Sequence, residues 1–185
     1  GNAGVMAATN EAVAAAQFPM LLWVFGAVAA LCLLTFRSFA ATLCILLPLG
    51  LASLLAYALM AWLEIGLKVG TLPVVALGVG IGVDYGIYIY SRFAALRRPG
   101  RSLRETYEDA LAITGNGVLF TGLTLGLAVA TWVLSSLKFQ ADMGILLVFL
   151  FVMNMIGAIV LLPALAHFLV GEPKPGKDPE PKPAR

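Results

Sequence analysis

Apolar residues gather in five long runs that are separated by polar breaks. A helix rises 1.5 Å per residue, so about 20 apolar residues cross the ~30 Å hydrocarbon layer of a membrane. Each of the five runs is about that long or longer. The pattern therefore predicts an all-α membrane protein, a bundle of five transmembrane helices. The predicted spans are residues 18–36, 39–63, 71–91, 110–134 and 143–170.

Composition supports this interpretation and excludes several other classes of protein. Apolar residues make up 61% of the 185 residues and charged residues 12%, whereas soluble domains hold about 45–50% and about 25%. The net charge is only +2, and the basic residues do not form one soluble basic face, which argues against a nucleic-acid partner. Cys32 and Cys44 lie inside apolar runs, which is typical of packing residues and not of a disulfide framework.

The distribution of basic residues predicts the orientation. Five spans place the two ends of the chain on opposite sides, and 10 of the 12 basic residues fall on the side of the C-terminus. Loops rich in Lys and Arg stay in the cytoplasm, so we expect the C-terminus inside and Gly1 outside. The ten residues are Arg37, Arg92, Arg97, Arg98, Arg101, Arg104, Lys174, Lys177, Lys182 and Arg185; Lys68 and Lys138 lie on the other side.

Three segments outside the spans have distinctive compositions or patterns. Residues 1–17 are rich in alanine, and we interpret them as the end of an external (periplasmic) domain or as a helix leading into the membrane. Residues 102–110 combine a Ser-x-x-Glu capping box with amphipathic spacing, which predicts a cytoplasmic amphipathic helix that leads into the fourth span; a solvated helix is the alternative. Residues 171–185 alternate proline with charged residues, which predicts a disordered cytoplasmic tail.

The third span carries the chemistry. Asp84 is the only acidic residue within the five runs, and a carboxylate at membrane depth costs about 3 kcal/mol or more. Such a group can load and unload a proton, although a neutral Asp that bonds two helices together is the alternative. Gly78, Gly82 and Gly86 recur every four residues on one helix face, where they allow another helix to pack closely.

The fourth span adds hydroxyl groups that are spaced along one helix face. Thr114, Thr121 and Thr124 could hydrogen-bond Asp84 or hold water beside it, or they could bond back to their own helix. Asn154 is the other polar candidate at depth, and we expect His167 at the membrane interface. With one His and no Cys pair at ligand spacing, the sequence predicts no metal site and no cofactor.

These residues resemble a known family. The stretch Leu72-Pro73, then Gly78 to Ile87 (Gly-Val-Gly-Ile-Gly-Val-Asp-Tyr-Gly-Ile), then Ser91-Arg92-Phe93 resembles the fourth helix of each half of the resistance-nodulation-division (RND) transporters. The branch it resembles includes the MMPL, sterol-sensing-like and hopanoid-exporter-like proteins. Supporting stretches are Phe36-Arg37-Ser38-Phe39, Leu46-Leu47-Pro48-Leu49-Gly50, Ala112 to Gly115, Thr121 to Thr124, and Leu161 to Leu165.

The resemblance implies that the chain is the C-terminal membrane half of such a transporter, helices 8–12, in the inner membrane. It implies a proton relay formed by Asp84 and Tyr85, joined by Thr121, Thr124 and Thr114 at matching positions. The fourth span has no Lys, so the relay differs from that of the drug-pump branch. The implied activity is proton-driven export of lipidic or hydrophobic molecules, and not an enzymatic reaction.

The implied partners are the N-terminal half of the same transporter, the membrane and a lipidic or hydrophobic small molecule. A homo-oligomer stays open, and no nucleic acid is expected. Two alternatives to export also stay open. A protein-translocation accessory protein of the same superfamily would carry an Asp-Ala-Asn-like run in place of Asp84-Tyr85. A non-transporting, sterol-sensing-like lipid-binding module would tolerate replacement of Asp84.

Overall fold

The computed structural model describes residues 2–65, 72–98 and 100–170, and every regular element within these ranges is a helix. The residue 66–71 break, with Lys68 and the start of the third predicted span, lies outside the described residues, as does the tail 171–185. The elements in chain order are α1 (Asn2–Phe36), α2 (Phe39–Trp62), α3 (Leu72–Leu96), α4 (Leu103–Ala130), the 3₁₀ turn η1 (Thr131–Leu134), α5 (Lys138–Ile156), the π-helical turn η2 (Gly157–Leu161) and α6 (Leu162–Val170).

The prediction of an all-α bundle with five membrane-spanning helices is confirmed. Five helical stretches are long and apolar enough to cross a membrane: Glu11–Phe36, Phe39–Trp62, Pro73–Leu96, Leu103–Leu134 and Lys138–Val170. Several of these stretches extend beyond the predicted spans, because the helices continue through polar residues at their ends. Residues 2–17 belong to α1 and pass without a break into the first span.

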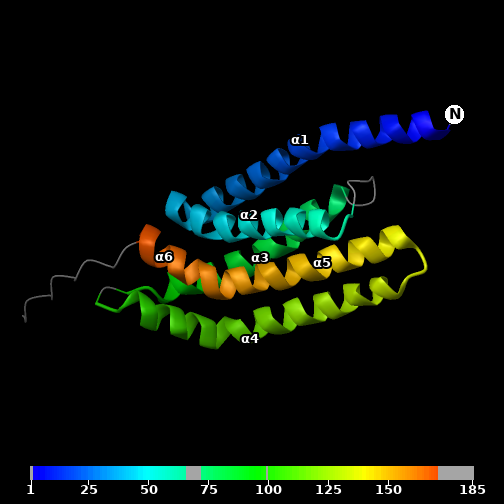
Figure 1. Cartoon of the computed structure of the whole chain (residues 1–185). Coiled ribbons are helices and arrows are strands. Elements are labelled where there is room, and N and C mark those ends of the chain that lie inside the picture. The colour runs from blue at the N-terminus through cyan, green and yellow to red at the C-terminus, as the bar shows by residue number, and fades with distance from the viewer. Residues whose placement is uncertain (1, 66–71, 99, 171–185) are drawn as a thin grey trace, which may run out of the picture.

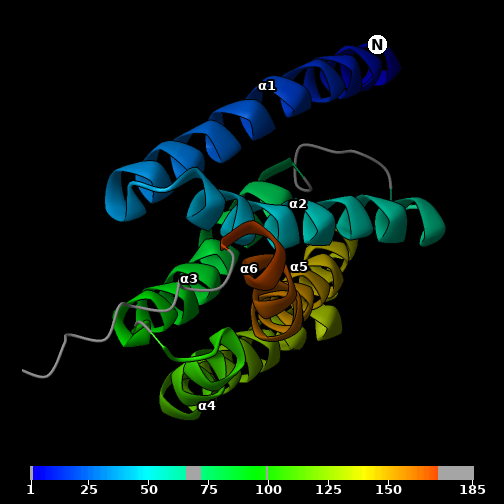
Figure 2. The same cartoon turned by 90° about the vertical axis from the view of Figure 1, so that its left-hand side faces the viewer.

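The helices lie side by side along one direction (Figure 1). The first residues of α1 lie at one end of the bundle, and α6 ends at the other. Seen from the side in Figure 2, α1 and α4 lie at opposite edges, with α2, α3 and α5 between them. Helix α3 packs against α1, α2, α4 and α5, so its residues occupy the centre of the bundle.

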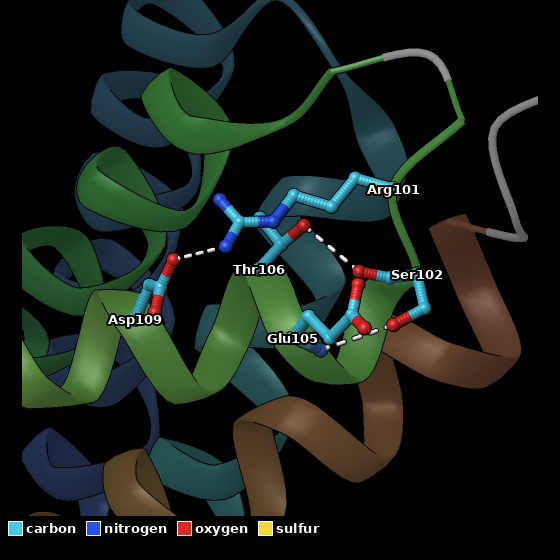
Figure 3. A network of polar contacts seen from close by, with 5 residues as sticks. All are labelled: Arg101, Ser102, Glu105, Thr106 and Asp109. Carbon is cyan, nitrogen blue, oxygen red and sulfur yellow. Dashed lines mark hydrogen bonds and ion pairs between the residues drawn. The ribbon is translucent and has the colours of Figure 1, made fainter.

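Helix α4 begins at a polar cap, where the sequence predicts a capping box. The Ser102 Oγ accepts a hydrogen bond from the Glu105 backbone N–H (3.2 Å), and the Thr106 hydroxyl donates to the Ser102 carbonyl (2.9 Å). Arg101 forms an ion pair with Asp109 across the first two turns, as Figure 3 shows. The segment expected to lead into the fourth span forms the first turns of α4, which continues from Leu103 to Ala130 without interruption.

The last span changes its helical type at a proline. Pro163 has no N–H, so the Ile159 carbonyl lacks the bond that a regular α-helix would form to residue 163. The chain widens there into the π-helical turn η2. The Tyr107 hydroxyl reaches across from α4 and donates to the carbonyls of Ala158 and Ile159, each at 3.1 Å. Tyr107 thereby joins the start of α4 to the junction of α5 and α6.

Candidate functional site

Helix α3 presents two different faces that are each built on four-residue spacing. Gly78, Gly82 and Gly86 are buried in the bundle, whereas Gly80, Asp84 and Tyr88 are exposed. Two residues correspond to about 200° around a helix, so the second series lies almost opposite the first. One face of α3 therefore packs inside the bundle, and the other lies on the surface of the chain.

The glycine face receives side chains from α5 and α2. A Cβ atom on Gly82 would lie 2.2 Å from the Asn154 Nδ2, and a Cβ on Gly78 would lie 2.6 Å from the Leu150 Cδ1. On the α2 side, a Cβ on Gly86 would lie 3.0 Å from the Ile45 Cγ2. The three glycines therefore contact helices of this same chain, and close packing of the kind expected for them is present.

Asn154 fixes the register between α5 and α3. Its side chain is 3% exposed, and its Nδ2 donates a hydrogen bond to the Gly78 carbonyl at 2.9 Å. The bond gives the Asn154 Nδ2 a partner in an apolar bundle, where an unpaired N–H is costly, whereas the Asn154 Oδ1 is buried without a partner among the described residues. The sequence singled out Asn154 as a polar candidate at depth, and in the structure it packs two helices together.

Asp84 lies on the open face at the middle of α3, twelve residues from either end of Leu72–Leu96. It borders a groove of about 280 Å³ between α3 and α4. The groove is lined by Asp84, Tyr85, Tyr88, Gly117, Val118 and Thr121. A carboxyl, two phenol rings and a hydroxyl thus come together at mid-helix height on a surface that no other described element covers.

Tyr85 differs from Asp84 in how deeply it is buried. Its side chain is 3% exposed, and its hydroxyl oxygen has no hydrogen-bond partner among the described residues. A buried hydroxyl without a partner costs about 1–3 kcal/mol.

The three threonines separate in the structure. Thr121 lines the groove with Asp84, and its hydroxyl donates to the Gly117 carbonyl at 2.8 Å. Thr114 is buried and donates to the Ala110 carbonyl at 2.6 Å, so its hydroxyl bonds its own helix. Thr124 is exposed on α4 but does not border the groove. Of the three predicted relay threonines, the structure brings only Thr121 to Asp84.

Sequence reasoning did not single out Tyr88 as a site residue, and it assigned Asp142 to a break. Tyr88 is 53% exposed and lies one helical turn after Asp84, so its four-residue spacing from Asp84 was the available signal. Asp142 is 8% exposed near the start of α5, within the fifth membrane-spanning stretch. Within the described residues, no group of three or more His, Cys, Asp or Glu side chains is placed to hold a metal ion.

Comparison with known proteins places the chain in a family of membrane proteins. The profile of the MMPL family matches residues 1–182. A Methanocaldococcus jannaschii protein named as a membrane protein is 32% identical over 120 residues, which are 65% of this chain and 31% of that protein. A Streptomyces coelicolor protein named in the same way is 34% identical over 101 residues, which are 55% of this chain and 14% of that protein.

A third relative is the membrane protein YdfJ of Bacillus subtilis, which is 26% identical over 89 residues. That match covers 48% of this chain and 12% of YdfJ. The chain thus spans a third or less of the length of these three relatives. The family match covers nearly the whole chain, and it agrees with the five apolar helices and with the glycine-rich third span. The chain belongs to the MMPL family.

Proposed function

We propose that this chain is the C-terminal membrane half of a proton-driven exporter of lipidic or hydrophobic molecules, with Asp84 as the proton-carrying group. The observation that carries the proposal is the place of Asp84, at mid-helix on the open face of α3, beside Tyr85 and Thr121. The MMPL family, whose members are transporters and not enzymes, gives the class of activity.

The position of Asp84 supports a role in proton transfer. Twelve residues of helix correspond to about 18 Å, so the carboxyl lies near the middle of a ~30 Å apolar layer. Ionisable residues at that depth are rare, and they mark ion and proton pathways when they face a cavity or a polar neighbour. Asp84 faces a groove with two phenol rings and one hydroxyl, which is a setting in which a proton can be taken up and passed on.

The open face of α3 and α4 supports a second membrane segment as the partner. Asp84, Thr121 and Thr124 are exposed here, and lipid tails offer no hydrogen bonds to such groups. We propose that the N-terminal half of the same transporter covers this face and completes the site. Because the glycine face of α3 is already filled by α2 and α5, the partner packs against the Asp84 face and not against Gly78, Gly82 and Gly86.

The test is Asp84→Asn in the full-length transporter, measured as lipid export from cells and as proton flux in proteoliposomes with an imposed pH gradient. Asn has nearly the same shape and cannot release a proton, so we expect folding to persist and both activities to fall to background. The matched control is Asp109→Asn, the same change at the Arg101 ion pair near the start of α4. Export at the unmodified rate by Asp84→Asn would assign Asp84 a structural role.

A further inference from the structure

A second groove lies at the end of the bundle where α4 begins and α6 ends. It has a volume of about 420 Å³ and runs between the first turns of α4 and the body of α6, with Phe93 of α3 as part of its wall. Its size falls within the ~300–1,000 Å³ of small-molecule sites. None of the residues that line it borders the Asp84 groove, so the two sites are separate.

The lining of this groove changes from apolar to charged. Phe93 and Leu103 are buried at its base, and Pro163 and Ala164 add apolar surface from α6. Arg104, Glu108 and His167 also line it, and all three are exposed. A ligand that fits must therefore be apolar at one end and polar at the other.

Hydrogen bonds and an ion pair within the chain fix the spacing of the walls. The Tyr107 hydroxyl bonds the carbonyls of Ala158 and Ile159, so this wall residue is fixed to the π-helical turn that precedes α6. The Ser102 cap and the Arg101–Asp109 ion pair fix the first turns of α4, as seen in Figure 3. The groove is thus formed before any ligand binds, which lowers the cost of binding.

The position along the bundle indicates where the two ends of the ligand lie. Helix α3 ends at Leu96, α4 begins at Leu103 and α6 ends at Val170, so the groove opens within two or three turns of three helix ends. An apolar base suits the hydrocarbon layer of a membrane, and a charged edge suits the level of the lipid headgroups. Water is a poor occupant of the apolar base, whereas an acyl chain is a good one.

The charge around the opening selects the headgroup. At this end of the chain, residues 92–109 carry five arginines (Arg92, Arg97, Arg98, Arg101 and Arg104) and three carboxylates (Glu105, Glu108 and Asp109), a net charge of +2. Arg104 donates to Glu108 through its Nε at 2.8 Å, and the two remaining guanidinium nitrogens each carry two further N–H donors. Basic pockets between membrane helices bind the phosphate of anionic lipids.

We propose that this groove binds an anionic phospholipid, with one acyl chain along Phe93 and Leu103 and the headgroup phosphate at Arg104 and His167. The lipid would act as a wedge between α4 and α6 and stabilise their separation. The inference rests on the shape and charge of this groove, and it does not depend on the role proposed for Asp84.

The first experiment measures the headgroup preference. The purified protein is titrated in detergent with phosphatidylglycerol or phosphatidylcholine of identical acyl chains, and bound lipid is counted by native mass spectrometry. We expect phosphatidylglycerol to bind about fivefold or more tightly, the attraction that one basic residue gives toward anionic lipid. Arg104→Gln should remove about that factor for phosphatidylglycerol and weaken phosphatidylcholine less, because the choline cation offsets the charge of the phosphate in phosphatidylcholine. Arg37→Gln is the matched control, an exposed arginine at the same end outside the groove.

The second experiment fills the groove without changing its charge. Ala164 is exposed in the groove lining, so Ala164→Trp places an indole in the acyl-chain path and should abolish the tight lipid adduct. Ala112→Trp is the matched control at an exposed position of α4 outside the groove, and circular dichroism confirms that both variants fold. Equal affinity for the two lipids in the unmodified protein, or an unchanged adduct in Ala164→Trp, would overturn the proposal.

Discussion

At the scale of single residues, two glycines of α3 have opposite surroundings although they are only two positions apart. A Cβ on Gly82 would lie 2.2 Å from the Asn154 Nδ2 and 2.9 Å from the Leu49 Cδ1. A Cβ on Gly80 would meet no atom within 4 Å. The side chain of Asn154 cannot simply turn away from an added methyl group, because its Nδ2 is bonded to the Gly78 carbonyl.

These surroundings predict opposite effects of the same substitution. Gly82→Ala should lower the free energy of unfolding by about 1–3 kcal/mol, because the added methyl group overpacks the contact and strains the Asn154 hydrogen bond. Gly80→Ala should leave stability unchanged or raise it slightly, since alanine favours the helix. Thermal unfolding of both variants in the same detergent checks this pair, and equal melting temperatures would contradict the packing derived for Asn154.

At the scale of elements, the junction of α5 and α6 depends on a tyrosine from another helix. Tyr107→Phe removes the donor to the Ala158 and Ile159 carbonyls and keeps the ring. We expect a loss of about 1–3 kcal/mol in unfolding free energy, together with faster amide exchange in residues 157–162, because the two carbonyls lose a partner. The control is Tyr88→Phe, whose ring is largely exposed on α3. Unchanged exchange in Tyr107→Phe would show that η2 is stable without this bond.

The apolar pattern was sufficient to predict the number and type of the membrane-spanning elements. The apolar pattern alone did not give the start of α4, which the Ser102 capping box predicted; Leu103, Thr106 and Tyr107 are buried and bring the polar first turns into the same helix. It also could not assign the threonines. The spacing places Thr114 and Thr121 on the same face of α4, but the neighbouring helices of the bundle cover only part of that face. Thr114 is consequently buried and bonded to Ala110, whereas Thr121 borders the groove.

At the candidate site too, the sequence indicated the residues, whereas tertiary packing determined which of them are covered. A lone acid in a glycine-rich span made Asp84 a candidate functional residue, and the four-residue glycine spacing predicted a close packing face. Which side of α3 would meet this chain's own helices depended on tertiary contacts. Asn154 fills the Gly82 face, and this leaves the Asp84 face open.

At the scale of the whole molecule, the direction in which the bundle sits in the membrane is a proposal that labelling can test. We predict that the loop between α3 and α4 is cytoplasmic and that the loop before α5 is external, because of the uneven distribution of basic residues. In a Cys32→Ala/Cys44→Ala background, Ser136→Cys should react with a membrane-impermeant maleimide in intact cells, and Arg98→Cys should react only after lysis. Both native cysteines are buried, so their removal lowers the background without exposing new surface. The reverse labelling pattern would invert the orientation.

The open face of α3 and α4 bears on whether this chain can be active alone. Asp84, Thr121 and Tyr88 lie on a surface that the described elements leave uncovered, and the Tyr85 hydroxyl is buried next to them without a hydrogen-bond partner among the described residues. If the N-terminal half supplies the missing cover, the isolated chain has an incomplete proton site.

We therefore expect the 185-residue chain alone to insert into proteoliposomes and fold, yet to move neither protons nor a fluorescent lipid when a pH gradient is imposed. Adding the proposed N-terminal half should restore both fluxes, and this restoration should fail when the added chain is paired with Asp84→Asn. Folding of the isolated chain is checked by its helical circular dichroism spectrum, so that inactivity is not confused with misfolding. Coupled movement of protons and lipid by the isolated chain would show that Asp84 and its groove need no partner. The open face of α3 and α4 would then be a surface that contacts lipid.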